Sequence, residues 1–274
     1  MGTLYLVATP IGNLEDITFR AVRILNEVDL IAAEDTRIAR RLLDHYGIST
    51  AVTSYHDNSP QSKLDRIHHA LTTGDVALIS DAGMPAISDP GNDVVATARR
   101  AGHPVIPIPG PSAVTAAAAV ATGSDRGFIF GGFLPRKPAE RRARLQSLAG
   151  LNLPVILFES PNRIEKLLDL IEDALPEATV LIGREITKIH EEWREGKPAD
   201  LRSTVNPRGE FTVVVTPNLV EHDPSIERVD ELLDTAFDIG LSVRDASALI
   251  AQALEVPRNA VYQRAISKRA PNSG

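Results

Sequence analysis

The stretch SDAGMPAISDPG, residues 80–91, directly follows the apolar run VALI of residues 76–79. A short, continuously apolar run of this kind is typical of a buried strand in a parallel sheet. In an open α/β sheet, ligands bind outside the carboxyl ends of the strands, and a loop of small residues lets the backbone approach a ligand closely. We therefore predict an α/β fold with a ligand site at this strand end, where Asp81 supplies a hydrogen-bond acceptor.

The first strand of the chain has the same setting. Residues 3–7, TLYLV, are typical of a strand, and the loop ATPIGNLEDIT follows at residues 8–18. Either Asp16 or Thr18 is placed to cap a helix that continues with apolar residues at helical spacing. This segment therefore predicts a second strand end whose loop is able to contact a ligand.

A third strand end follows the same pattern. The strand candidate VIPI, residues 105–108, leads into the loop PGPSA at 109–113 and then into the alanine-rich segment 114–121. We predict that Ser112 caps a helix there and presents its hydroxyl at the positive end of that helix. Because three strand ends of one sheet each have such a loop, we expect the loops to share one crevice.

The pattern of the chain predicts two α/β domains. Apolar strand candidates alternate with helical patterns, which favours parallel strands joined by right-handed crossovers. The first domain is predicted at residues 1–122, and the second, of similar architecture, at residues 123–220. The predicted strands are residues 4–7, 30–33, 76–80 and 105–107 in the first domain, and 128–133, 155–158, 180–184 and 210–215 in the second.

Residues 225–274 are predicted to form a small helical module. Segment 225–237 is amphipathic and Gly240 breaks its helix, after which SVRD at 242–245 is a capping box that opens the next helix. Pro257 is placed at the start of a third helix. Three short helices with a glycine turn favour a helix-turn-helix-like module, and the alternative is an appendage that packs on the main body.

Composition limits the class of protein and the kind of site. The chain has no cysteine, which removes disulfides, thiolate nucleophiles and iron–sulfur ligation. The adjacent histidines His68 and His69 point to different faces of a helix, so we expect no protein-bound metal. No apolar run is long enough to span a bilayer and the N-terminus enters a strand directly, so we expect a cytoplasmic protein that does not contact membranes.

The charge of the chain is unevenly distributed. A net charge of −7 argues mildly against a nucleic-acid partner, because neutralising phosphates requires Lys and Arg. The distribution of the charge matters more than its total, however. Residues 136–144, RKPAERRAR, are predominantly basic and include the single acid Glu140, so this run is either a solvated helix face or a phosphate-binding surface that begins with Arg136 and Lys137.

Seven motifs carry a resemblance to a known family. They are TPIGNLEDIT (9–18), EDTR (34–37), SYHDNS (54–59), SDAGMPAISDPG (80–91), PGPSA (109–113), FESPNR (158–163) and REITKIHEEWREG (184–196). In this order they resemble the 16S ribosomal RNA cytidine 2′-O-methyltransferases, a branch of the tetrapyrrole-methylase superfamily of S-adenosylmethionine (SAM) enzymes. The resemblance covers essentially the whole chain. The first loop lacks the Gly-rich sequence ending in Gly-Asp of the tetrapyrrole enzymes, which favours the ribosomal RNA branch.

The resemblance implies two α/β domains of the tetrapyrrole-methylase type with a cleft between them, and SAM bound in that cleft. It also implies transfer of the SAM methyl group to the ribose 2′-hydroxyl of a cytidine in the decoding region of 16S rRNA. The family precedent favours the 30S subunit as the substrate and a homodimer as the assembly. The positions that match the cofactor site are Pro10, Ile11, Asp81, Met84, Ser112, Ala113 and Phe158.

The acceptor side of the reaction has its own candidates. Transfer to a hydroxyl is an in-line displacement that requires alignment and a group that accepts the hydroxyl proton. The sequence leaves Glu34, Asp35 and Lys188 as alternatives for that group, while Arg37 is placed to hold a phosphate. The remaining candidates for contact with the RNA are Tyr55, His56, Asn58, Arg136, Lys137 and Arg163.

Two other functions remain as alternatives. A SAM-dependent C-methylase acting on a tetrapyrrole would need neither a basic strip nor a helical tail. A nucleotide- or RNA-binding protein without catalysis would have degenerate strand-end motifs, whereas the motifs here are intact. A Rossmann dehydrogenase and a serine hydrolase are disfavoured because the chain has no G-x-G-x-x-G after a strand and no G-x-S-x-G.

Overall fold

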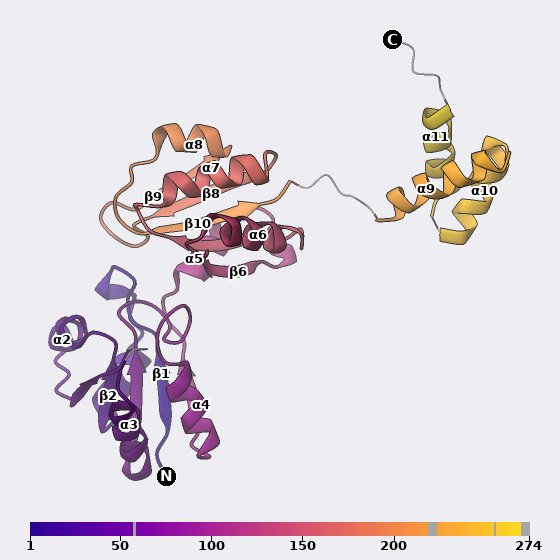
Figure 1. The fold of residues 1–274 in the computed structure, drawn as a ribbon. Helices are drawn as coiled ribbons and strands as arrows, with labels where there is room; N and C mark the ends of the chain where they lie inside the picture. Colours follow the sequence, from indigo (N-terminus) through magenta and orange to yellow (C-terminus); the bar gives the residue numbers. More distant parts are fainter. Residues whose placement is uncertain (57–58, 219–223, 255, 270–274) are drawn as a thin grey trace. The chain divides into compact units, whose positions relative to one another are not determined.

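The computed structural model describes residues 1–56, 59–218, 224–254 and 256–269 of the chain. The chain divides into two compact units, residues 1–218 and residues 219–274. The first unit contains two five-stranded sheets, and the described part of the second unit contains three helices (Figure 1). The predicted α/β fold with a helical module is thus confirmed, while the predicted domain limits at residues 122 and 220 stay predictions.

The first sheet consists of parallel strands in the order β3-β2-β4-β1-β5. Its strands are β1 (Leu4–Val7), β2 (Leu30–Ala33), β3 (Val52–Ser54), β4 (Val76–Ile79) and β5 (Val105–Ile108). Strands β2 and β4 are buried along their whole length, which explains why they contain only apolar residues. Because the strands are parallel, the loops after β1, β4 and β5 meet at one edge of the sheet, as the sequence predicts.

Helices cover both faces of the first sheet (Figure 1). They are α1 (Phe19–Glu27), α2 (Thr36–His45), α3 (Gln61–Thr73) and α4 (Asn92–Arg100). Helices α1 and α2 pack on one face through Leu25 and Leu43. Helices α3 and α4 pack on the other face through Leu71 and Val94. The sheet is therefore a middle layer, and only its edges and strand ends remain for a ligand.

Local sequence sets the start of α1. Thr18 is the N-cap, and its hydroxyl accepts a hydrogen bond from the N–H of Ala21 at 3.0 Å. Of the two predicted cap candidates, Thr18 therefore caps the helix. Asp16 instead ends the short 3₁₀ helix η1 (Leu14–Asp16), whose own cap is Asn13.

The second sheet is mixed and has the strand order β6-β7-β10-β8-β9. Its strands are β6 (Ile129–Phe133), β7 (Val155–Glu159), β8 (Thr179–Arg184), β9 (Glu192–Gly196) and β10 (Phe211–Thr216). Strands β6 and β7 are parallel, and every other neighbouring pair is antiparallel. Phe211 at the start of β10 consequently pairs with Glu159 and Arg184, the last residues of β7 and β8.

Strand β9 is absent from the predicted strands because its sequence, EWREG, is mostly charged. It lies at the edge of the second sheet and pairs only with β8. An edge strand tolerates charged side chains because one of its sides remains open to water. Residues 192–196 therefore form a strand because of their place at the edge of the sheet, and an apolar pattern in their sequence is not required.

The second sheet is also covered on both faces. On one face lie α6 (Pro138–Ala149), α7 (Ile164–Ala174) and α8 (Pro198–Thr204). On the other face lies α5 (Ala113–Val120), which packs through Ala117 and Ala118. The 3₁₀ helix η2 (Ser124–Arg126) follows α5. Helix α5 thus begins at a strand end of the first sheet and packs on the second, so one element connects the two.

The second unit contains α9 (Pro224–Asp238), α10 (Val243–Leu254) and α11 (Arg258–Arg269), which enclose an apolar core of their own. Ser242 caps α10 as the sequence predicts: the N–H of Asp245 donates to the Ser242 hydroxyl at 3.1 Å, and that hydroxyl donates to the Asp245 carboxylate at 2.6 Å. In the described parts of the chain, no helix combines the length and apolar character needed to cross a membrane.

Candidate active site

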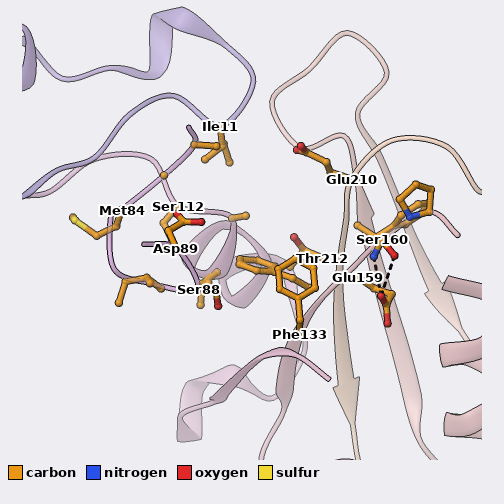
Figure 2. Close-up of a pocket in the computed structure, with 18 residues that line it drawn as sticks. Ile11, Met84, Ser88, Asp89, Ser112, Phe133, Glu159, Ser160, Glu210 and Thr212 are labelled. Atoms are coloured by element: carbon orange, nitrogen blue, oxygen red, sulfur yellow. Dashed lines mark hydrogen bonds between the residues drawn. The ribbon is translucent and has the colours of Figure 1, made fainter. Parts of the chain in front are cut away.

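A cavity of about 350 Å³ lies in the first unit, between the loops at the carboxyl edge of the first sheet and the second sheet. Its lining residues from the first side include Ile11, Met84, Ser112 and Ala113, and those from the second side include Phe133 and Phe158 (Figure 2). Five predicted cofactor positions thus line one cavity. Pro10 and Asp81, the other two, are not among its lining residues, and all seven assignments stay predictions.

The loop after β1 is fastened to the loop after β4. The N–H of Thr9 donates to the carbonyl of Gly83 at 2.9 Å, and the N–H of Gly83 donates to the carbonyl of Thr9 at 2.9 Å. The buried Thr9 hydroxyl also donates to the Ser80 carbonyl at 3.1 Å. Gly83 has a φ of +78°, which favours glycine. These bonds fix Ile11 on the cavity wall, two residues after Thr9.

The loop of residues 80–91 is held in a strained conformation. Ala86 has a φ of 66° and Ser88 a φ of 61°, in the left-handed region that side chains other than glycine disfavour. Such residues cost about 1–3 kcal/mol each, and they concentrate at functional sites. Ser88 lines the cavity with Met84 and Asp89 (Figure 2). The strain therefore falls on the same loop that forms the cavity wall.

Ser112 is the N-cap residue of α5 but does not act as the cap that the sequence predicts. Its side chain makes no capping hydrogen bond to the helix. Ser112 instead lines the cavity (Figure 2), as do the first residues of α5, Ala113 and Val114. The first N–H groups of a helix have no intrahelical partner and carry partial positive charge. This part of the wall is therefore suited to a negatively charged group.

Aromatic side chains form the opposite wall. The ring of Phe158 contacts that of Phe130 edge to face, with ring centroids 5.0 Å apart, and that of Phe133 at 5.7 Å. Phe133 and Phe158 line the cavity, and Phe133 is 55% exposed. An aromatic wall of this kind suits a flat, apolar ligand group. The sequence predicts only Phe158 as part of the site.

A buried carboxylate, that of Glu159, belongs to the same lining. The side chain of Glu159 is 1% exposed and accepts a hydrogen bond from Arg141 at 2.5 Å, while Arg163 lies 3.3 Å away on its other oxygen. The same carboxylate accepts from the N–H of Ser160 at 2.8 Å. Burial lowers the pKa of Arg141. Arg163 also donates to the Leu134 carbonyl at 2.9 Å, which connects the start of α7 to the segment after β6, and its contact with RNA stays a prediction.

Lys188 joins the two sides of the site. Its ammonium donates to Glu185 at 2.9 Å and to Glu210 at 3.0 Å, and Glu210 lines the cavity. A Cβ added to Gly12 would lie 2.4 Å from Cγ of Lys188, so only glycine leaves room for the lysine stem there. The turn that holds Lys188 is strained, with a φ of 51° at Glu185 and 68° at Thr187.

Lys188, Glu185 and Glu210 form a charged cluster, and their contacts determine the protonation of Lys188 and Glu185. Burial lowers the pKa of Lys188, but the hydrogen bonds from the lysine to Glu185 and Glu210 outweigh burial, so the pKa lies above its ordinary value of 10.5. Burial raises the pKa of Glu185, yet the hydrogen bonds from the Glu210 N–H and from Lys188 leave it below its ordinary value. Lys188 is therefore a charged donor at neutral pH and poorly suited to accept a proton.

The acidic residues after β2 form a second cluster, with Asp81. The carboxylate of Asp81 accepts from the N–H of Asp35 at 3.0 Å, and the N–H of Asp81 lies 3.5 Å from the Glu34 carboxylate. Asp35 caps α2 and pairs with Arg37 at 2.6 Å. The hydrogen bond from Arg37 lowers the pKa of Asp35 to about 2, whereas burial raises the pKa of Asp81.

The other predicted substrate contacts are scattered. Tyr55 is 5% exposed and belongs to the apolar core beneath the first sheet, which argues against direct contact with a large substrate. His56 is exposed, and Asn58 lies outside the described residues. Arg136 and Lys137 are exposed just before α6, and Lys137 pairs with Glu140 at 2.9 Å.

The cavity residues that the predicted site misses include Phe133, Glu210 and Thr212. Glu210 and Thr212 reach the cavity because β10 is antiparallel to β7 and begins at the edge where β7 ends. Sequence patterns do not reveal strand direction, so no signal in the chain indicated them. In the described ranges, no three His, Asp or Glu side chains gather closely enough to hold a metal ion, and the predicted absence of a metal stays a prediction.

Comparison with known proteins identifies the class. Residues 3–202 match the family model Tetrapyrrole (Corrin/Porphyrin) Methylases, and residues 223–269 match the RsmI C-terminal HTH domain. Among solved structures, a diphthine synthase matches with a TM-score of 0.62 at 14% identity, covering 78% of this chain and 90% of that one. A uroporphyrin-III C-methyl transferase from Thermus thermophilus, complexed with S-adenyl homocysteine, matches with a TM-score of 0.56 at 18% identity, covering 78% and 97%.

The fold is thus that of a tetrapyrrole methylase. Two curated proteins named ribosomal RNA small subunit methyltransferase I are more similar in sequence. The one from Synechocystis sp. is 43% identical and covers 96% of this chain and 97% of its own, and the one from Pseudomonas aeruginosa is 42% identical and covers 98% of each. The chain therefore belongs to the ribosomal RNA small subunit methyltransferase I family, within the SAM-dependent tetrapyrrole methylases.

Proposed function

We propose that this methyltransferase transfers the methyl group of SAM to the ribose 2′-hydroxyl of a cytidine in the decoding region of 16S rRNA. Seven ordered motifs resemble the enzymes with this activity, and the relatives are named for the RNA of the small ribosomal subunit. The observation that carries the proposal is the 350 Å³ cavity, where the three predicted loops meet the second sheet.

The residues of this cavity fit SAM. A volume of 350 Å³ lies within the range of about 300–1,000 Å³ that small-molecule sites occupy. The start of α5 and the Ser112 hydroxyl suit the carboxylate of the cofactor's amino-acid part. The apolar walls at Ile11 and Phe158 suit its adenine and its alkyl chain. In this proposal Pro10 and Asp81 support the lining loops from outside the cavity.

Bound SAM supplies a methyl group on a sulfonium, and the protein aligns the acceptor oxygen and receives its proton. Of the three candidates for that proton, Asp35 has a pKa lowered to about 2 and Lys188 has a raised pKa. Both shifts make proton acceptance at neutral pH unfavourable. We therefore favour Glu34 as the base, with Lys188 as a donor that orients the acceptor and Asp35 as a support for the Asp81 loop.

Contacts to the RNA backbone are proposed for exposed cations. Arg136 and Lys137 are exposed, and Arg37 has a side chain that is 87% exposed. Exposed cations contact phosphates without reading the sequence of the RNA. The assembled 30S subunit as substrate, the homodimer and a cytoplasmic location belong to the same proposal and rest on the family resemblance.

The test is methyl transfer from radiolabelled SAM to 30S subunits from a strain that lacks the modification. Naked 16S rRNA and a tetrapyrrole precursor serve as alternative acceptors, and digestion of labelled RNA locates the methyl group. We expect label on one ribose 2′-oxygen of a cytidine. Label on a base, or label on the tetrapyrrole alone, overturns the proposed acceptor. No label anywhere with SAM still bound means that the chain binds SAM without this activity.

A further inference from the structure

A second, open cavity of about 640 Å³ lies beside the first one. It is a groove lined by the loop after β1, by the end of α2 and by the turn between β8 and β9; its walls include Gly12, Asn13, His45, Lys188, Ile189 and His190. We propose that this groove, which we call the acceptor groove, holds the nucleoside whose ribose is methylated. The inference rests on the proposed function, because it assumes an RNA acceptor.

The acceptor groove and the cofactor cavity share a wall. Ile11 lines the cavity, and the next residue, Gly12, lines the groove. On the other side, Lys188 lines the groove, and its ammonium lies 3.0 Å from the carboxylate of Glu210, which lines the cavity. The groove and the cavity therefore meet at Gly12 and Lys188. Methyl transfer requires the acceptor oxygen to lie in contact with the methyl group, so the proposal places the ribose 2′-hydroxyl at this junction, facing the cavity.

The chemistry of the groove favours a sugar and a base over a phosphate. Lys188 is already paired with two carboxylates, and Glu15 adds a further acid to the groove. A site with so little unpaired positive charge is poorly suited to a phosphate. Asn13, His45 and His190 offer donors and acceptors that suit the hydroxyls of a ribose and the edge of a base.

The outer part of the groove presents apolar surface to water. Ile189 is 98% exposed and Leu14 is 39% exposed, and both line the groove. An unstacked base of single-stranded RNA is recognised through apolar contact with its face and hydrogen bonds to its edge. These two side chains supply the apolar contact, and the histidines supply the hydrogen bonds. The groove thus has the mixed lining that a splayed-out nucleoside requires.

The turn between β8 and β9, which forms one wall of the groove, has an unfavourable local conformation. Thr187 is a β-branched residue with a φ of 68°, and its buried hydroxyl has no hydrogen-bond partner in the described structure. Left-handed backbone at such a residue is uncommon, and it concentrates at sites where function requires the geometry. The turn is held by the pairing of Lys188 and by the N–H of Thr187, which donates to Glu191 at 2.9 Å.

The test combines two exposed positions of the groove in the variant Ile189→Ala/His190→Ala. Steady-state transfer to unmodified 30S subunits gives KM and kcat, and calorimetric titration gives the Kd of SAM. The matched control is Leu151→Ala/His69→Ala, which alters one exposed aliphatic side chain and one exposed histidine away from both cavities. Because both variants change solvent-exposed side chains, circular dichroism melts are expected to match that of the unaltered chain.

We expect the groove variant to raise the KM for 30S subunits roughly tenfold, from one lost hydrogen bond and one lost apolar contact, with the Kd of SAM unchanged. The control is expected to leave both constants unchanged. An unchanged KM in the groove variant overturns the acceptor groove, and so does a KM that rises only with a matching loss of SAM binding. Absence of transfer by the unaltered chain to any RNA is a different result: it overturns the proposed function and the groove together.

Discussion

The ammonium of Lys188 lies 3.0 Å from the carboxylate of Glu210, which connects the turn between β8 and β9 to the segment just before β10. The stem of the same lysine fills the space in which a side chain at residue 12 would lie. One residue of the turn between β8 and β9 is therefore packed against the loop after β1 and paired with a residue that lines the 350 Å³ cavity. This arrangement makes Lys188 the residue whose replacement tests the site most directly.

Replacing Lys188 with methionine is expected to lower kcat at least tenfold, because the variant keeps the stem but loses the charged donor. Lys188→Arg keeps a donor and is expected to retain more activity. The pKa of Lys188 is raised, so the rate of the unaltered enzyme between about pH 7 and 9 is not expected to follow the titration of this lysine. Lys166→Met, at an exposed position of α7, is the control. A rate that climbs with pH only in enzymes that keep Lys188 would instead identify it as the base.

Gly12→Ala is expected to displace the Lys188 stem without removing any charge. The new Cβ would lie 2.4 Å from Cγ of Lys188, and overpacking of this kind costs about 1–3 kcal/mol. The lysine then loses its bond to Glu210, so kcat falls together with the free energy of unfolding. Gly196→Ala is the matched control, because its Cβ would meet Leu201 at an ordinary 3.8 Å. Urea denaturation and the transfer assay measure the two effects, and equal behaviour of the two variants contradicts the prediction.

Glu159→Gln is expected to destabilise the first unit by about 3–5 kcal/mol, because it leaves the buried guanidinium of Arg141 without its counter-charge. The side chains of this pair are 1% and 8% exposed. The exposed pair of Lys137 and Glu140 supplies the comparison, and Glu140→Gln is expected to cost less than about 1 kcal/mol. Urea unfolding of both variants measures the difference. A loss of less than 1 kcal/mol in Glu159→Gln would show that the buried pair contributes little.

The first sheet and its ligand edge follow from the sequence because parallel, fully buried strands leave a distinct pattern. The run VALI of residues 76–79 and the small-residue loop after it indicate both the strand and its carboxyl end. Ile11, Met84 and Ser112 line one cavity because their loops all follow strands of that sheet. In such a fold, the position of a loop along the chain is enough to predict the edge to which it belongs.

The second sheet shows what the sequence leaves open. Glu210 lies at the cavity only because β10 is antiparallel to its neighbours, and an apolar run such as FTVVV has no direction of its own. The partners of Lys188 depend on the same reversal, since they come from the ends of two different strands. For Tyr55 the sequence predicts a contact with the substrate, whereas in the structure its side chain is buried in the apolar core of the first sheet. Strand direction and burial depend on tertiary contacts that local patterns do not encode.

The pKa values of Asp35 and Asp81, in the acidic cluster, are expected to be shifted in opposite directions from that of a free aspartate. The hydrogen bond from Arg37 lowers the pKa of Asp35 to about 2, and burial raises that of Asp81 above 3.8. Asp35 therefore stabilises the fold above its unfolded pKa, and this contribution is lost as the pH falls toward 2. The sign is reversed for Asp81, whose charged form is disfavoured in the fold, so its cost disappears as the pH falls. Carboxyl carbon NMR measures both pKa values. Arg37→Ala is expected to return the pKa of Asp35 toward 3.8. A pKa that stays near 2 in this variant would show that Arg37 is not the cause of the shift.

Ser112→Ala is expected to separate cofactor binding from helix capping. An N-cap serine that bonds to its helix typically contributes about 1 kcal/mol to stability, but Ser112 makes no such bond, so the variant should unfold at nearly the same urea concentration as the unaltered chain. Its hydroxyl lines the cavity, and loss of one hydrogen bond to a charged ligand group weakens SAM roughly tenfold or more. Thr18→Ala is the reciprocal control, because Thr18 bonds to the N–H of Ala21 at 3.0 Å and lies outside the cavity lining, so that variant should lose stability and keep its SAM affinity. Calorimetric titration and urea unfolding of both variants give the comparison. If Ser112→Ala loses stability and retains SAM affinity, the serine is a cap after all and the start of α5 does not hold the cofactor.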